Sequence, residues 1–212
     1  MSVKKLCKNY GIAITGGIAT GKSEATNLLS SWGYFCLDAD KLAREAVMPG
    51  THGFKEIVKT FGQMILAPDG SLDRKKLKQL IFQDTELRKK LESITHPEIR
   101  KLMEHKLEHE GLVQAPQIWF YEAALIFEAG IGNDFREVWL VVADPELQYA
   151  RLQKRDAINS KQAQDIISAQ MTVEEKEKLA NVVIENHGDL EELSETLRQA
   201  VDALKERMGI SG

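Results

Sequence analysis

A glycine-rich segment near the amino terminus carries the residues best suited to chemistry. Residues 16–23 fit the pattern G-x-x-x-x-G-K-S, known as Walker A, and read Gly16-Gly17-Ile18-Ala19-Thr20-Gly21-Lys22-Ser23. Glycines in this pattern let backbone N–H groups close around phosphate oxygens, and the start of the following helix adds partial positive charge. We therefore expect this segment to bind the phosphates of a nucleoside triphosphate through Gly17, Ile18, Ala19, Thr20, Gly21, Lys22 and Ser23. The adjoining Glu24 belongs to the expected ATP-binding set, but its carboxylate would point away from the phosphates on the helix.

Two side chains of this segment have distinct expected roles. Lys22 would place a full positive charge beside the β- and γ-phosphates, and the Ser23 hydroxyl would ligate Mg²⁺, which prefers oxygen ligands shared with phosphates. The chain has no N-K-x-D sequence for guanine recognition and no L-S-G-G-Q sequence of transport ATPases. The pattern therefore favours a kinase of small molecules that uses ATP and Mg²⁺.

An acidic pair follows the next apolar run along the chain. Asp38 directly follows the apolar run 34–37, and Asp40 comes two residues later. Ligands of doubly wound sheets lie at the carboxyl ends of the strands, so Asp38 could accept the proton of a substrate hydroxyl as the γ-phosphate arrives. The alternative is that Asp38 or Asp40 caps the helix that follows, a common use of aspartate after a strand.

The elements that would position these residues alternate between strand and helix. Short apolar runs predict five strands at 10–15, 34–37, 117–121, 137–143 and 182–184. Helical periodicity occupies 22–32, 144–180 and 189–208, and proline suits the helix start at Asp144-Pro145. This order predicts an α/β protein with a doubly wound parallel sheet of the P-loop NTPase type.

The region between the second and third strands differs in character. It is rich in Lys, Glu, Leu and Arg, is punctuated at Pro49-Gly50, 68–70 and His96-Pro97, and contains no convincing buried strand. We expect a helical substrate-binding insertion at 41–111 and a helical lid at 147–180. The nucleotide-binding core would then comprise 1–40, 112–146 and 181–212.

Composition is that of an ordinary soluble enzyme. The chain has 212 residues, 43% of them hydrophobic, with a net charge of −4. This charge gives no reason to expect nucleic acid or an anionic membrane as a partner, and no stretch approaches the roughly 20 apolar residues of a membrane span. Cys7 and Cys36 lack C-x-x-C spacing, so we expect buried thiols and a cytoplasmic protein. Monomer and small homo-oligomer both stay open.

Taken together, the motifs resemble those of the dephospho-CoA kinase family in their usual order and over nearly the whole chain. They are the Walker A segment, 37–45, Pro49-Gly50, Phe61-Gly62, 72–74, 96–99, 125–128, 151–156, Ala169-Gln170, Lys176 and 183–188. The resemblance implies transfer of the ATP γ-phosphate to the ribose 3′-hydroxyl of dephospho-CoA, with Mg²⁺.

The resemblance also implies roles for particular residues. Asp38 would be the base, while Arg44 and His96 would line the acceptor pocket; the alternatives for the last two are a solvated charge and a helix cap or packed imidazole. Arg151 and Arg155 would close over the phosphates, although two arginines four residues apart could also form a solvated face. Asn186 would contact ATP.

Four positions depart from the family pattern. Glu122 and Ala124 stand where the family shows aspartate and proline, and Glu122 could still hold a Mg²⁺-bound water with a longer side chain. Asn181 replaces an aspartate, and Ile166 an arginine of the lid. Two other readings stay open: a kinase of another acceptor such as a nucleoside monophosphate, and a nucleotide-binding regulator without catalysis.

Overall fold

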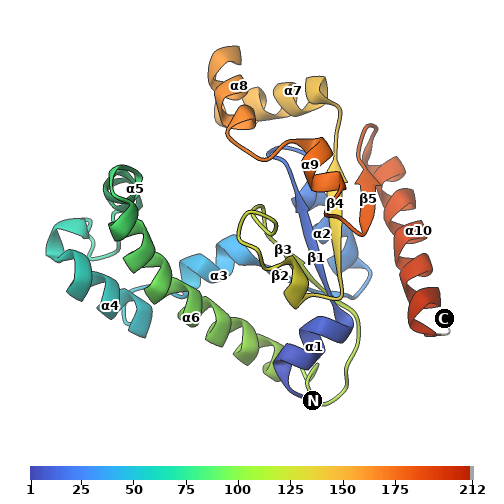
Figure 1. Ribbon diagram of the computed structural model, residues 1–212, viewed down its shortest axis with the longest axis horizontal. Helices are drawn as coiled ribbons and strands as arrows, with labels where there is room; N and C mark the ends of the chain where they lie inside the picture. The colour runs from blue at the N-terminus through green and yellow to red at the C-terminus, as the bar shows by residue number, and fades with distance from the viewer. Residues whose placement is uncertain (211–212) are drawn as a thin grey trace. The chain divides into compact units, whose positions relative to one another are not determined.

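The computed structural model describes residues 1–210 and contains a five-stranded sheet with the strand order β2-β3-β1-β4-β5 (Figure 1). The strands are β1 (Gly11–Gly16), β2 (Phe35–Asp38), β3 (Trp119–Glu122), β4 (Glu137–Val142) and β5 (Val182–Glu185). β1 pairs in parallel with β3 and β4, and β4 pairs in parallel with β5. The predicted parallel α/β sheet is confirmed, and its strands lie within two residues of the expected bounds.

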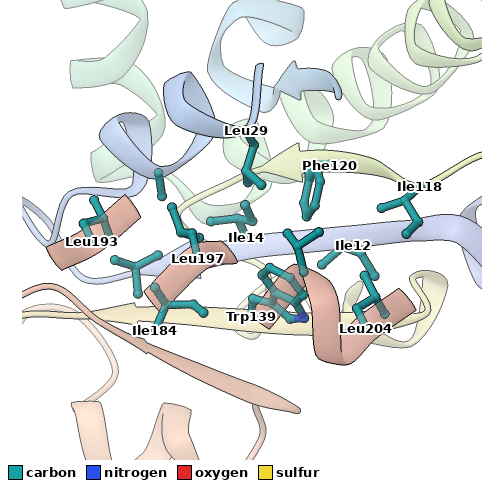
Figure 2. Close-up of a cluster of buried hydrophobic side chains, with 13 residues drawn as sticks. Ile12, Ile14, Leu29, Ile118, Phe120, Trp139, Ile184, Leu193, Leu197 and Leu204 are labelled. Atoms are coloured by element: carbon teal, nitrogen blue, oxygen red, sulfur yellow. The ribbon is translucent and has the colours of Figure 1, made fainter. Parts of the chain in front are cut away.

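Two helices cover one face of the sheet, α2 (Lys22–Ser31) and α10 (Leu190–Met208). Their apolar side chains interlock with those of the strands, as Figure 2 shows. This cluster includes Ile12, Ile14, Phe120, Trp139 and Ile184 from strands, and Ala25, Leu29, Leu193, Leu197, Val201 and Leu204 from helices. Every residue of β1 is buried, as expected of a central strand covered on both faces.

A short helix that the sequence analysis did not predict precedes the sheet. α1 (Val3–Tyr10) begins after Ser2, whose hydroxyl accepts a hydrogen bond from the backbone N–H of Lys5, and it buries Leu6 and Cys7. The expectation that the first strand starts at residue 10 was therefore wrong, because Tyr10 ends this helix and β1 starts at Gly11. Two apolar residues in eight gave too weak a periodicity to recognise.

The two cysteines differ in burial. Cys7 is buried, as expected, whereas Cys36 is only partly buried. The Cys36 thiol donates a hydrogen bond to the backbone carbonyl of Thr26 at 3.6 Å. Burial, and secondarily the charge of Glu122, raise the pKa of this thiol to about 12. Cys36 is therefore a protonated, unreactive thiol at neutral pH.

Compact packing divides the chain into two units, Leu37–Ala115 and the remainder, Met1–Cys36 with Pro116–Gly212. The first unit is helical, with α3 (Ala39–Glu45), α4 (His52–Phe61), a 3₁₀ turn η1 (Gln63–Ile65), α5 (Arg74–Gln83) and α6 (Thr85–His109). Its own apolar core includes Ala46, Val47, Ile57, Ile65, Leu72 and Leu77. The region expected as an insertion at 41–111 is therefore helical, and the compact unit that contains it spans 37–115.

Helix α6 corrects one detail of the sequence analysis. His96-Pro97 predicts a break, but α6 continues through Pro97 and has 25 residues. Proline removes one helical hydrogen bond, which disfavours such a position. Packing of α6 against α3, α4 and α5 offsets this loss, so tertiary contacts override the local signal.

The charged region after β4 forms three helices, α7 (Pro145–Asp156), α8 (Ser160–Ser168) and α9 (Val173–Glu177). Pro145 occupies the first turn of α7, as expected. Capping boxes start the other two: Asn159 with Gln162 at α8, and Thr172 with Glu175 at α9. A second 3₁₀ turn, η2 (Gly132–Asp134), precedes β4. Within residues 1–210, no helix is long and apolar enough to cross a membrane.

We predict that Leu197→Ala lowers the free energy of unfolding by about 2–5 kcal/mol, because Leu197 is fully buried and the change leaves a cavity. Urea denaturation measures this loss. The matched control is Leu190→Ala on the same helix, where the side chain is 57% exposed and the expected change is within about 0.5 kcal/mol. Equal losses in both variants would contradict the assignment of α10 to the core.

Candidate functional site

The glycine-rich segment lies between β1 and α2, as the sequence predicted. Two of its residues have positive φ, Ala19 at 60° and Gly21 at 96°. A side chain at Gly21 would collide with the amide nitrogen of Asn186. Both its φ and its crowding therefore require glycine at this position.

The side chain of Lys22 folds back over this segment. Its ammonium group donates hydrogen bonds to the backbone carbonyls of Gly16 at 3.0 Å and Gly17 at 2.8 Å. The Thr20 hydroxyl also donates to the Gly17 carbonyl, at 3.0 Å. These contacts hold the positive charge of Lys22 at the loop, where an anionic ligand would meet it.

Asn186 contacts the loop from the carboxyl end of β5. It directly follows β5, is 4% exposed, and its Nδ2 donates to the Thr20 carbonyl at 2.7 Å. The residue expected to contact ATP thus bonds to the backbone of the phosphate loop itself. This bond connects the carboxyl ends of β1 and β5 over 166 positions of sequence.

Glu122, at the end of β3, meets the start of α2. One carboxylate oxygen accepts a hydrogen bond from the Ser23 hydroxyl at 2.8 Å, and the other accepts from the Thr26 hydroxyl at 2.6 Å. The longer side chain that replaces the family's aspartate therefore reaches the serine. Sequence reasoning paired Ser23 with Glu122 but did not identify Thr26, which lies one helical turn after Ser23.

The other three residues that depart from the family pattern lie near β4, β1 and α8. The side chain of Asn181 accepts a hydrogen bond from the backbone N–H of Val138 at 2.7 Å, which joins the start of β5 to β4. The carbonyl of Ala124 accepts from the Thr15 hydroxyl at 3.2 Å. Ile166 is partly exposed on α8.

The two arginines expected to belong to a lid lie on α7 in different environments. Arg155 forms a bidentate pair with its neighbour Asp156, at 2.7 and 2.9 Å. This hydrogen bonding raises the pKa of Arg155, with a smaller contribution from the charge of Glu24, and lowers the pKa of Asp156. In contrast, the Nη1 atom of Arg151 is buried without a hydrogen-bond partner. Buried groups of this kind call for an acceptor, and a phosphate oxygen is one.

Asp38, Arg44 and His96 belong to the helical unit. Asp38 is the residue that caps α3: its Oδ1 accepts from the backbone N–H groups of Asp40 at 2.8 Å and Lys41 at 3.0 Å. Asp40 lies in the first turn instead of at the cap. The second oxygen of Asp38 is 3.6 Å from the ammonium of Lys41. Arg44 and His96 are exposed on α3 and α6, two helices that pack together.

Comparison with known proteins agrees with this architecture. A sequence model of the dephospho-CoA kinase family matches residues 10–192. The chain is 46% identical to the dephospho-CoA kinase of Geobacter sulfurreducens, over 89% of this chain and 95% of that protein. It is 44% identical to the dephospho-CoA kinase of Geobacter metallireducens, over 93% and 96% of the two chains.

Solved structures give the same result. A Thermus thermophilus protein, TT1252, matches 92% of this chain and 97% of its own with a TM-score of 0.78 and 36% identity. The dephospho-CoA kinase of Campylobacter jejuni matches the same shares with a TM-score of 0.68 and 26% identity. With the phosphate loop in place and the family matched over most of its length, this chain belongs to the dephospho-CoA kinase family.

Proposed function

We propose that this chain transfers the γ-phosphate of ATP to the ribose 3′-hydroxyl of dephospho-CoA, giving CoA and ADP, in the cytoplasm. The observation that carries the proposal is an ordered phosphate loop, with Lys22 held against it, in a chain that matches the family from residue 10 to 192. The core of 1–40, 112–146 and 181–212 would bind ATP. The segment 41–111 would bind the acceptor, and 147–180 would act as the lid.

ATP binding is assigned to the phosphate loop and its immediate neighbours. The backbone N–H groups of 19–23 and the start of α2 supply the partial positive charge, and Lys22 supplies the full charge. The Ile18 N–H is already engaged with a side-chain oxygen of Gln170. Asn186 keeps the loop in its binding conformation through its bond to Thr20. Glu24 is exposed and adds no positive charge, so its part is limited to its interaction with Arg155.

Mg²⁺ fits the oxygen atoms at the start of α2. The Ser23 hydroxyl and the Glu122 carboxylate lie 2.8 Å apart, and both are ligands that Mg²⁺ uses directly or through water. Within residues 1–210 there is no cluster of three His, Cys, Asp or Glu side chains that could hold a metal by itself. Few protein ligands suit an ion that shares most of its coordination with water and phosphate. When bound, Mg²⁺ would neutralise charge on the phosphates.

Asp38 is the proposed general base. Its Oδ1 is engaged at the cap of α3, which fixes the orientation of the carboxylate. Its Oδ2, which lies 3.6 Å from the exposed Lys41 ammonium, would be the proton acceptor. The substrate hydroxyl would lose its proton to Oδ2 as its oxygen bonds to the γ-phosphorus and ADP departs. One carboxylate can therefore cap α3 and act as the base, so the two interpretations of Asp38 do not exclude each other.

Four cationic or polar side chains would serve the two substrates. Arg44 and His96 would hold the acceptor, since both are exposed and lie on helices that pack together. Arg151 and Arg155 would stabilise the charge of the transferring phosphoryl group, which is the main catalytic task in this chemistry. Of the two, Arg151 already has a buried N–H without an acceptor.

The acceptor identifies the reaction. We predict that purified protein with Mg-ATP forms ADP rapidly with dephospho-CoA, and little with AMP, with CMP or without an acceptor, because the relatives matched over most of their length are dephospho-CoA kinases. Coupled detection of ADP and mass analysis of the nucleotide product measure this. Turnover with AMP or CMP instead would point to a nucleoside monophosphate kinase, and no turnover with any acceptor to a regulator.

We predict that Asp38→Asn lowers kcat by about 10²- to 10⁴-fold, the usual worth of a positioned general base. The fold and ATP affinity should persist because asparagine caps helices as well as aspartate does. Steady-state kinetics and ATP titration measure the two effects. The matched control is Asp40→Asn, two residues along in the first turn of α3, which should keep most of its turnover. Undiminished turnover in Asp38→Asn would refute the assignment.

A further inference from the structure

A glutamine outside the predicted site is bonded to the phosphate loop. Gln170 lies in the turn between α8 and α9, and its Oε1 accepts a hydrogen bond from the backbone N–H of Ile18 at 2.9 Å. The two residues are 152 positions apart in sequence. This contact therefore connects the lid segment directly to the loop that would bind ATP.

A second glutamine covers the adjoining residue. Gln148 is 5% exposed on α7, and a methyl group added to Gly17 would lie 2.7 Å from its Nε2 and 3.7 Å from Oε1 of Gln170. The α-carbon of Gly17 is thus enclosed by two side-chain amides from different lid elements. A side chain at residue 17 would therefore displace the amide end of Gln148.

The turn that carries Gln170 is itself held at both ends. The Gln170 backbone N–H donates to the Ile167 carbonyl at 3.1 Å, and Thr172 caps α9. Further along α9, the Lys176 side chain is 1% exposed, and its ammonium lies 3.2 Å from a carboxylate oxygen of Glu128. Lys176 and Glu128 therefore form an ion pair, although the geometry between the two groups is not that of a hydrogen bond. Gln170 therefore projects from an anchored segment.

The same lid face carries a proposed catalytic arginine. Arg151 follows Gln148 by three residues on α7, a spacing that places two side chains on one face of a helix. Its buried Nη1 has no hydrogen-bond partner. Fixing the lid to the Gly17–Ile18 peptide therefore also constrains where Arg151 can reach.

We infer that Gln170 is a positioning residue for phosphoryl transfer, which fixes the Gly17–Ile18 peptide and holds the lid in register with the phosphate loop. The inference rests on the proposed function, since it concerns the same transfer. A neutral amide suits the task because it satisfies the Ile18 N–H without placing negative charge beside a polyphosphate. A carboxylate of the same length would bond equally well but would repel the nucleotide.

Two substitutions separate these effects. Gln170→Met keeps the length of the side chain but removes the acceptor, and should lower kcat about tenfold, since small misplacements of reacting groups are costly. The KM for dephospho-CoA should stay within roughly twofold, because ground-state binding of the acceptor is not involved. Gln170→Glu keeps the acceptor and should weaken Mg-ATP binding about tenfold through like-charge repulsion. The matched control is Gln164→Met at an exposed site on α8, which should behave as wild type.

Amide hydrogen exchange gives a readout that does not depend on turnover. In protein without nucleotide, the Ile18 amide should exchange about tenfold faster in Gln170→Met than in wild type or Gln170→Glu. Wild-type exchange at Ile18 and wild-type kcat in Gln170→Met would overturn the inference, as would equal defects in all three variants. If wild type itself fails to phosphorylate dephospho-CoA, the proposed function falls. The exchange rates and Mg-ATP affinities then still decide whether Gln170 positions the loop.

Discussion

The conformation of the phosphate loop constrains most of the rest of the structure. Its backbone must turn sharply between β1 and α2, which requires Gly21 at φ 96° and leaves no room for a side chain against Asn186. The buried bond from Asn186 to the Thr20 carbonyl, at 2.7 Å, then fixes the loop from outside. A buried carbonyl deprived of this donor would cost about 1–3 kcal/mol. The conformation of the phosphate loop therefore depends on the hydrogen bond from Asn186.

The parallel sheet makes these contacts possible. Because β1 lies between β3 and β4, with β5 beyond β4, the residues that follow these strands meet at one edge. Glu122, the last residue of β3, reaches Ser23, and Asn186, just after β5, reaches Thr20. The segment between α8 and α9 adds Gln170 to the same loop. The buried face formed with α2 and α10 supplies the rigidity, while the polar residues gather at the strand ends.

Sequence periodicity was sufficient for the sheet but not for every helix. The five apolar runs predicted the strands because buried parallel strands are nearly continuous in hydrophobic residues. Helix α1 was missed because only Leu6 and Cys7 of its eight residues are buried. The break assumed at Pro97 was wrong because packing of the long helix α6 outweighs one lost hydrogen bond.

The site divides in a similar way. Local motifs sufficed to locate the phosphate loop and to nominate Asp38, because the residues involved are adjacent in sequence. Contacts between residues far apart in the sequence could not be derived from local motifs. The hydrogen bond of Thr26 to Glu122 spans 96 positions, and that of Ile18 to Gln170 spans 152. Gln170 belongs to the family pattern, but nothing in the linear sequence indicates which backbone N–H it contacts.

The central claim is that phosphate is transferred to one particular hydroxyl. The most direct test incubates the protein with Mg-ATP and dephospho-CoA and locates the new phosphate by phosphorus and proton NMR, beside a 3′-deoxy analogue of the acceptor. We expect a single product phosphorylated at the ribose 3′-oxygen and no reaction with the analogue. Phosphate at another position, or comparable turnover of the analogue, would contradict it.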